Sequence, residues 1–382
     1  MPLFLFLFFL LMVAYAVLIA YYHKAWNQLP FFALPQKQAT TFISVVIAAR
    51  NEEDNIQALL QSLYEQQYPK ELYEVIVVDD HSTDNTRTLL QQAGYTGLQL
   101  KTRWLEDFVT DKNVAVSYKK KAIETGIDAA AGTLIVTTDA DCRFDAQWLQ
   151  TIAAFYETNN AKFIAAPVTF TKGHTLLSIF QSLDFLTLQG ITAASVYKRF
   201  HSMCNGANLA YEKAAFYEVN GFNGIDSLPS GDDMLLMHKI FTRYPNQVFY
   251  LKNRHAIVTT APAASWKQFF HQRIRWASKA DSYDDKRIFW VLLLVYVLNV
   301  CFLVGAIACF WRSIWLFFTL LLLLAKVLIE FPFVNSVAIF FGRQGLMKYF
   351  PFLQPLHILY TIIAGWLGKF GHYEWKGRRI NK

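Results

Sequence analysis

One stretch decides the fold that the sequence predicts: Glu-Val-Ile-Val-Val-Asp-Asp-His-Ser-Thr-Asp, residues 74–84. Residues 74–78 form a short run of mostly β-branched apolar side chains, as expected of a strand buried on both faces of a parallel sheet. Residues 79–84 are acidic and hydroxyl-rich, as expected of the loop after such a strand. Ligands of open parallel sheets bind beyond the carboxyl ends of the strands, so this loop is a candidate binding site.

The same pattern occurs twice more. The apolar run at 42–49 is followed by Arg50-Asn51-Glu52-Glu53, and the run at 133–138 is followed by Asp139-Ala140-Asp141. Segments with helical spacing lie between the strands, at 55–66, 86–93 and 119–131, and Gly132 is expected to end the last of them. This alternation predicts an α/β fold with a Rossmann-like, mostly parallel sheet, and it places three charged clusters at one edge.

Composition indicates a membrane protein. Of the 382 residues 54% are hydrophobic and only 17% are charged, against about 25% in a typical soluble domain. Residues 3–22 carry no charge and are long enough to cross ~30 Å of hydrocarbon. A cleaved signal peptide ending near Ala14-Tyr15-Ala16 is the alternative, but the run lacks a basic start and continues to Tyr22. We therefore expect a retained anchor, followed by later apolar stretches at 288–311, 314–334 and 350–368.

Two further segments, 174–200 and 264–285, are amphipathic and either lie at a membrane surface or are ordinary core helices. The net charge is +7, and the tail from Lys369 onward holds five basic residues against Glu374, which suits anionic headgroups. Basic residues elsewhere are interleaved with acids, so nucleic acid is not an expected partner. The four cysteines show no metal-ligand spacing.

Two acidic pairs are candidates for chemistry. Asp139 and Asp141 at a strand end suit a hard divalent cation such as Mg²⁺ or Mn²⁺ together with substrate phosphates, although a lone Asp-x-Asp is more often a solvated turn. Asp232 and Asp233 open an expected helix near 234–241. They either satisfy the helix dipole or include a general base for an acceptor hydroxyl.

A third candidate cluster is Gln272-Arg273-Ile274-Arg275-Trp276, next to the second apolar stretch. Arg275 would neutralise a leaving diphosphate and Trp276 would offer a flat wall to a sugar or lipid. Alternatively, the cluster anchors the chain among headgroups.

Together these motifs resemble the inverting glycosyltransferases of family 2, which have a GT-A fold and include cellulose, hyaluronan and ceramide-glucosyl synthases. The resemblance covers about residues 42–276, in the family's order. It rests on Val77–Asp84, on Asp139-Ala140-Asp141, on Gly231-Asp232-Asp233 and on Gln272–Trp276. Asp232 departs from the glutamate usual in the family at this position.

The resemblance implies roles for individual residues. It implies Asp233 as the catalytic base. It implies Asp232, Gln272, Arg275 and Trp276 as further catalytic residues. It implies Asp139 and Asp141 as metal ligands, and as nucleotide contacts Ala48, Arg50, Glu52, Asp80, Asp139 and a lysine, either Lys120 or Lys121, of which we take Lys121. Asn205-Gly206-Ala207-Asn208 is expected to line the acceptor side.

The resemblance also implies an organisation and a location. We expect a transmembrane helix at 1–23, the GT-A domain at 40–262, an amphipathic interface helix at 263–286, a transmembrane region of about three apolar segments at 287–369, and a basic tail at 370–382. The enzyme would lie in the cell (inner) membrane as a multi-pass protein with a cytoplasmic catalytic domain. It would move a sugar from a nucleotide-sugar, with a UDP-sugar favoured, to a lipid, lipid-linked or glycan acceptor.

Two other functions stay open, a processive polysaccharide synthase and a non-catalytic sugar-nucleotide-binding scaffold. The topology is open too, because three full crossings after a cytoplasmic domain would leave the basic tail outside, against the positive-inside tendency. Either 350–368 does not cross fully or 314–334 is bent or re-entrant, with Lys326 and Glu330 spaced to form a pair.

Overall fold

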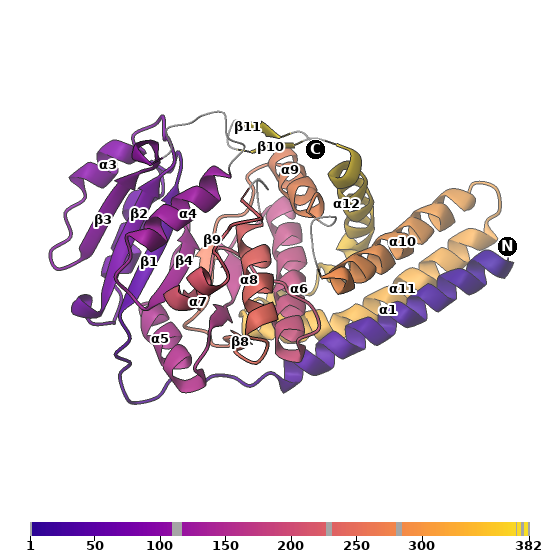
Figure 1. The fold of residues 1–382 in the computed structure, drawn as a ribbon. Coiled ribbons are helices and arrows are strands. Elements are labelled where there is room, and N and C mark those ends of the chain that lie inside the picture. The colour runs from indigo at the N-terminus through magenta and orange to yellow at the C-terminus, as the bar shows by residue number, and fades with distance from the viewer. Residues whose placement is uncertain are drawn as a thin grey trace. The chain divides into compact units, whose positions relative to one another are not determined.

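The computed structural model describes residues 2–108, 117–226, 231–279, 285–371, 373–375 and 378–380, with side chains up to residue 371. The chain forms two compact units (Figure 1). The sheet unit comprises Pro30–Thr171 and Ser202–Ala261, and the helical unit comprises Met1–Leu29, Lys172–His201 and Pro262–Lys382. Each is described by itself below.

The sheet unit is built on a seven-stranded mixed sheet of order β3-β2-β1-β4-β7-β5-β8. β1 to β4 run parallel, whereas β7 runs antiparallel to both β4 and β5. This confirms the predicted mostly parallel sheet, although only β1, β2 and β4 were anticipated from the sequence, and β3, β5, β7 and β8 were not. The strands are β1 Ile43–Ala49, β2 Tyr73–Asp79, β3 Gln99–Trp104, β4 Leu134–Asp139, β5 Phe163–Ala165, β7 Leu209–Glu212 and β8 Val248–Tyr250.

Strand register brings the charged loops together. Ala49 at the end of β1 lies opposite Asp79 at the end of β2, and Ala48 lies opposite Asp139 at the end of β4. The three strands therefore end level with one another. Consequently, the loops that follow them begin side by side at the carboxyl edge.

Helices complete this unit, and α2, for example, buries Ile56, Leu59, Leu60 and Leu63 at helical spacing. A small parallel sheet pairs β6 with β9. The elements are α2 Ile56–Tyr64, η1 Lys70–Leu72, α3 Thr86–Gln92, η2 Leu105–Asp107, α4 Tyr118–Asp128, α5 Trp148–Asn159, β6 Val168–Phe170, α7 Lys213–Glu218, α8 Asp232–Arg243 and β9 Val258–Thr260.

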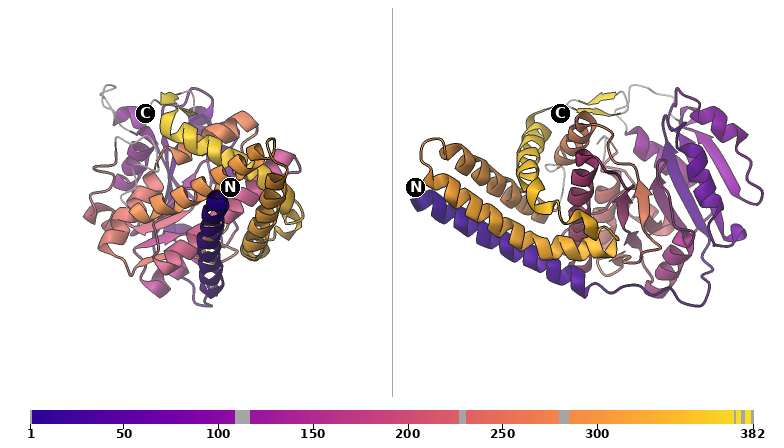
Figure 2. Two further views of the ribbon diagram at one scale, coloured as in Figure 1. Left: turned by 90° about the vertical axis from the view of Figure 1, so that its right-hand side faces the viewer. Right: turned by 180° about the vertical axis from the view of Figure 1, so that it is seen from behind.

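The described residues of the helical unit form six α-helices. α1 packs along α11 and α6, and α12 packs along α9 and α10 (Figure 2). The helices are α1 Pro2–Gln28, α6 Leu176–Lys198, α9 Trp266–Ala277, α10 Lys286–Ala308, α11 Ile314–Phe340 and α12 Phe350–Phe370, with η4 Gln344–Leu346 and a short hairpin of β10 Tyr373–Trp375 and β11 Arg378–Ile380. The side chains of the predicted basic tail at 370–382 lie outside the described residues, apart from Phe370 and Gly371.

Four of these helices, α1, α10, α11 and α12, are long and apolar enough to cross a membrane. Their outer faces carry large apolar side chains that water would not favour, among them Phe6, Trp290, Phe317 and Leu328, each at least 60% exposed. The four correspond to the four apolar stretches of the sequence. α12 has the lowest mean hydropathy of the four, 1.3, because polar side chains interrupt it.

A buried polar network joins three of these helices. Lys326 forms an ion pair with Glu330 at 2.6 Å, as their spacing predicts, and both contact Gln354 of α12 at 2.6 and 2.7 Å. The hydroxyl of Tyr15 on α1 donates to Glu330. In hydrocarbon each of these groups needs a partner, so together they fix how α1, α11 and α12 pack.

Gly132 does not end a helix as expected, because α4 already ends at Asp128. Instead, Gly132 lies where the chain passes very close to the backbone of β1. A Cβ on Gly132 would lie 2.6 Å from the Ser44 backbone nitrogen and 2.9 Å from the Ile43 carbonyl carbon. The Gly132 N–H donates to Ser44 Oγ at 2.8 Å, and Ser44 in turn donates to buried Glu74 at 2.6 Å.

We predict that Gly132→Ala destabilises the protein by about 1–3 kcal/mol, because the methyl group must displace strand backbone. Gly94→Ala is the matched control, since no atom lies within 4 Å of its Cβ position. Thermal unfolding of the two variants in detergent measures the difference. Equal unfolding temperatures would contradict the close approach.

Candidate active site

The carboxyl edge of the sheet concentrates acidic side chains. Asp139 ends β4, and Asp141 follows two residues later in a half-buried position. Burial raises the pKa of Asp141, and the nearby charges of Asp139 and Glu52 raise it further. The hydroxyl of Thr260, at the end of β9, donates to Asp141 Oδ2 at 2.8 Å. The hydrogen bond from Thr260 lowers the pKa of Asp141, but burial and the neighbouring carboxylates raise it by more. The edge is therefore strongly acidic.

Lys119, in the first turn of α4, is the cation that balances these acids. Its Nζ lies 2.8 Å from Asp139 Oδ1 and 3.5 Å from Asp232 Oδ2. Burial lowers the pKa of Lys119, but the charges of Asp139, Asp232 and Asp233 outweigh it and raise the pKa above its ordinary value. Lys119 therefore links Asp139, an expected metal ligand, with Asp232, the neighbour of the expected base Asp233.

The two aspartates of α8 have different surroundings. Gly231, with φ of 87°, precedes the helix, and Asp232 faces Lys119. Asp233 Oδ2 accepts the backbone N–H of Gly206 at 3.1 Å, and Oδ1 accepts the N–H of Met234 at 2.8 Å. The two N–H groups fix the orientation of the Asp233 carboxylate. Because Asp233 is only half-buried, this carboxylate remains accessible at the edge.

The loops after β1 and β2 are joined by hydrogen bonds. Nη1 of Arg50 donates to the Asp80 carbonyl at 2.7 Å and lies 3.7 Å from the buried Asp80 carboxylate. The N–H of Glu52 donates to Thr86 Oγ1 at 2.7 Å. Ala48 lies on β1 opposite Asp139. The expected nucleotide contacts Ala48, Arg50, Glu52 and Asp80 are thus brought to one place.

Lys121 is not brought there. Its Nζ pairs with Glu124 at 2.8 Å, one turn along the same helix, while buried Lys120 donates to the Ile225 carbonyl at 2.5 Å. Successive helix residues point about 100° apart, so only one of three consecutive lysines faces the edge. The sequence did contain a signal for Lys119. It precedes the apolar, buried residues Ala122 and Ile123 by three and four positions, so it lies on the same face of the helix as they do.

Asn208 was assigned to the acceptor side, but the structure makes it structural. It is fully buried, accepts from Trp148 Nε1 at 3.1 Å, and donates to the Pro167 and Ala256 carbonyls at 2.8 Å each. Its amide has no hydrogen left for a ligand. Within the same segment, it is Gly206 that contacts the edge, through Asp233.

Gln272, Arg275 and Trp276 lie on α9 in the helical unit. Oε1 of Gln272 is buried and has no hydrogen-bond partner among the described residues. The ring of Trp276 is half-buried and faces Phe185 of α6, with centroids 6.3 Å apart. Their spacing of three and four residues places the three side chains on one face of α9.

The acidic edge suits a divalent cation only together with a ligand. In the described part of the chain, no group of three or more His, Cys, Asp or Glu residues is placed to hold a metal ion by itself. Two carboxylates with a raised pKa at Asp141 do fit a cation whose other ligands are phosphate oxygens. Asp139 and Asp141 are the residues that would hold it.

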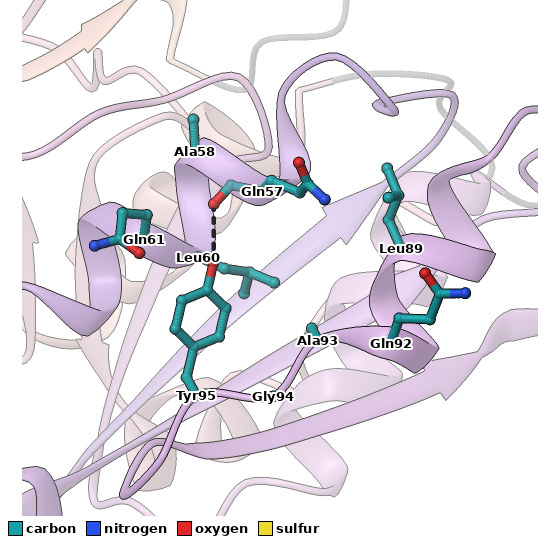
Figure 3. A pocket seen from close by; sticks show the side chains of 9 residues that line it. All are labelled: Gln57, Ala58, Leu60, Gln61, Leu89, Gln92, Ala93, Gly94 and Tyr95. Carbon is teal, nitrogen blue, oxygen red and sulfur yellow. Dashed lines mark hydrogen bonds between the residues drawn. The ribbon is translucent and has the colours of Figure 1, made fainter.

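A separate pocket lies between α2 and α3 (Figure 3). Its lining includes Gln57, Gln61, Gln92 and Tyr95, and the Tyr95 hydroxyl donates to the Gln57 carbonyl at 3.3 Å. It shares no residue with the acidic edge and contains no ionisable group suited to catalysis. We therefore place the candidate active site at the edge.

Comparison with known families gives two matches. Residues 134–363, more than half of the chain, match the model of glycosyl transferase family group 2. Residues 44–219 match the model of glycosyl transferase family 2. The first match runs without interruption from β4 through Gln272–Trp276 into α12.

Among curated relatives, glycosyltransferase AglE of Haloferax volcanii is 32% identical over 50% of this chain and 59% of its own length. The beta-monoglucosyldiacylglycerol synthase of a Nostoc species is 25% identical over 66% of this chain and 51% of its own length. The chain thus spans little more than half the length of these relatives.

Among solved structures, the mannosyltransferase PcManGT of Pyrobaculum calidifontis, in complex with GDP-Man and Mn²⁺, is similar with a TM-score of 0.63. The match covers 96% of this chain and 98% of that one, at 18% identity. At this identity the likeness concerns the fold alone, and it confirms the expected GT-A fold.

Proposed function

The chain is a family 2 glycosyltransferase, and from that premise we propose that it moves a sugar with inversion from a nucleotide-sugar to a lipid or lipid-linked acceptor at the cytoplasmic face of the cell membrane. The observation that carries this proposal is the acidic edge, where Lys119 pairs with Asp139 and Asp232 and also senses the charge of Asp233, while Asp141 follows Asp139 at the end of β4. Donor binding, charge neutralisation and proton removal each have a suitable residue there.

The donor side uses the loops after β1 and β2. Ala48, Arg50, Glu52 and Asp80 bind the nucleoside. Asp139 and Asp141 would hold a Mg²⁺ or Mn²⁺ ion, which would supply positive charge toward a departing diphosphate. The PcManGT structure was solved with GDP-Man and Mn²⁺, which supports a cation. We keep a UDP-sugar as the favoured donor and GDP-sugars as the alternative.

The acceptor side uses Asp233. Its carboxylate takes the proton of an acceptor hydroxyl while that oxygen attacks the anomeric carbon, and the bond from that carbon to the diphosphate breaks. Arg275 stabilises the leaving diphosphate, while Asp232, Gln272 and Trp276 complete the site, as the family motifs imply. Lys119 prevents Asp232 and Asp139 from repelling the donor.

A lipid acceptor is supported by the four apolar helices and by the Nostoc relative, whose name states a diacylglycerol product. Residues 287–369 and the helix at 263–286 would hold the active site near lipid. The alternative is a processive polysaccharide synthase, which would use the same motifs. One or two sugars on a lipid favour the first function, and a ladder of oligomers favours the second.

The test is transfer of radiolabelled sugar by the purified protein to total lipid extract, with a panel of UDP- and GDP-sugars. We expect a labelled lipid with at least one donor, and its loss on adding EDTA with recovery on adding Mg²⁺ or Mn²⁺. No transfer from any donor would favour a non-catalytic scaffold and would contradict the proposal.

Asp233→Asn is expected to keep donor binding and to lower transfer to a hydroxyl acceptor by roughly 10²–10⁴-fold, because the amide cannot take a proton. The measurement is turnover at saturating donor, together with the donor dissociation constant. A lipid phosphate needs no base since it is already ionised, so a small loss with a phosphate acceptor would identify that acceptor class. Near-normal turnover with a hydroxyl acceptor would remove Asp233 from the mechanism.

Lys119→Met is expected to weaken donor binding by about tenfold, equivalent to ~1.4 kcal/mol, because it leaves Asp139 and Asp232 unneutralised. Lys121→Met is the matched control, since its partner is Glu124. The donor KM of each variant measures the effect. A larger effect at Lys121 would show that the lysine implied by the resemblance, rather than Lys119, serves the donor.

A further inference from the structure

Arg273, inside the Gln272–Trp276 motif, has no role assigned so far, yet it is among the most buried basic residues of the helical unit. Only 4% of it is exposed. Its Nη2 lies 2.6 Å from Oδ2 of Asp184, which is buried on α6. A charge pair removed from water in this way is costly unless its geometry is held closely.

Asp184 is held from a second side by α12. The Tyr360 hydroxyl donates to Asp184 Oδ1, and His357 Nε2 lies 3.9 Å from the same oxygen. One carboxylate therefore ties the motif helix α9 to α6 and to α12. Around it, the rings of Phe180, Phe269 and Tyr360 pack edge to face with centroids 5.4–5.6 Å apart.

The other contact of Arg273 is with Trp276. The guanidinium carbon lies 4.2 Å from the centroid of the Trp276 ring and 4.9 Å from that of Phe269, three residues later and four residues earlier on α9. Phe185, the neighbour of Asp184 in sequence, faces Trp276 as well. Trp276 thus contacts both a cation and a ring.

The orientation of Arg273 depends on Asp184. None of the three guanidinium nitrogens of Arg273 has a hydrogen-bond partner within the described residues, so the ion pair with Asp184 and the two rings hold the guanidinium. Arginine suits this position because its planar group pairs with a carboxylate and stacks on a ring at once, which lysine cannot do. An apolar pair would pack equally well but would not set the plane of Trp276.

We propose that Asp184 is a positioning residue, which orients the indole of Trp276 through Arg273 and so shapes the acceptor side of the site. The proposal rests on the proposed function, in that Trp276 contacts the acceptor. The arrangement of Asp184, Arg273 and Trp276 affects binding of the acceptor and not of the donor, because none of the residues proposed to contact the nucleotide takes part in it. α12 joins the arrangement through Tyr360.

The test is a double-mutant cycle on purified enzyme in detergent micelles, with total lipid extract as acceptor and the donor that supports transfer. Asp184→Asn and Arg273→Lys are measured in the unaltered enzyme and in a Trp276→Phe background. Arg273→Lys keeps the charge and guards against loss of folding, which thermal unfolding monitors. Glu330→Gln is the matched control, since it breaks a buried pair in the same unit that does not contact Trp276.

We expect each of the two changes to lower kcat/KM for the acceptor by about tenfold with donor KM changed less than about twofold, since small misplacements of a binding group are costly. In the Trp276→Phe background the further loss should be under about twofold, because coupled residues are not additive. Glu330→Gln should have the same effect in both backgrounds.

Equal losses from Asp184→Asn in both backgrounds would overturn the inference, as would a change confined to donor KM. A fully active Trp276→Phe enzyme would also overturn it, while leaving sugar transfer intact. Absence of transfer by the unaltered enzyme would instead overturn the proposed function, and the inference with it.

Discussion

Mutual repulsion among carboxylates at one edge of the sheet is the constraint on which the site depends. Three parallel strands end level, and their loops add Asp80, Asp139 and Asp141 to an edge that also receives Asp232 and Asp233 from α8. Lys119 and Arg50 offset part of this charge. The negative charge that remains suits the divalent cation and the charged donor that we propose for this edge.

The helical unit solves a different problem, that of polar groups among apolar helices. Lys326, Glu330 and Gln354 satisfy one another, and Asp184 forms an ion pair with Arg273 and accepts a hydrogen bond from Tyr360. A buried polar contact adds little free energy of folding beyond what an apolar contact in its place would add. Its geometry nevertheless favours one relative arrangement of the helices that it joins. The motif helix α9 is held by one of them. Membrane attachment and orientation of the motif side chains therefore have the same physical origin.

Much of this follows from local sequence. Apolar runs with β-branched residues predict β1, β2 and β4 because buried parallel strands need them, and four apolar stretches predict α1, α10, α11 and α12. β3 was missed because its alternating, half-exposed side chains resemble a surface segment. Lys121 was chosen over Lys120, and Lys119 was not considered, because a run of three lysines has no register until the helix start is known. Asn208 was given to the acceptor because its burial is invisible in the sequence.

The sequence by itself determined the fold class, the family motifs and the carboxylates at the strand ends, since each depends on neighbours within a few residues along the chain. Only the tertiary structure decided which lysine meets Asp139, that Thr260 meets Asp141, and that Asp184 meets Arg273. These pairs join segments 20, 119 and 89 positions apart. Contacts of that kind depend on the packing of whole elements, and no local pattern specifies them.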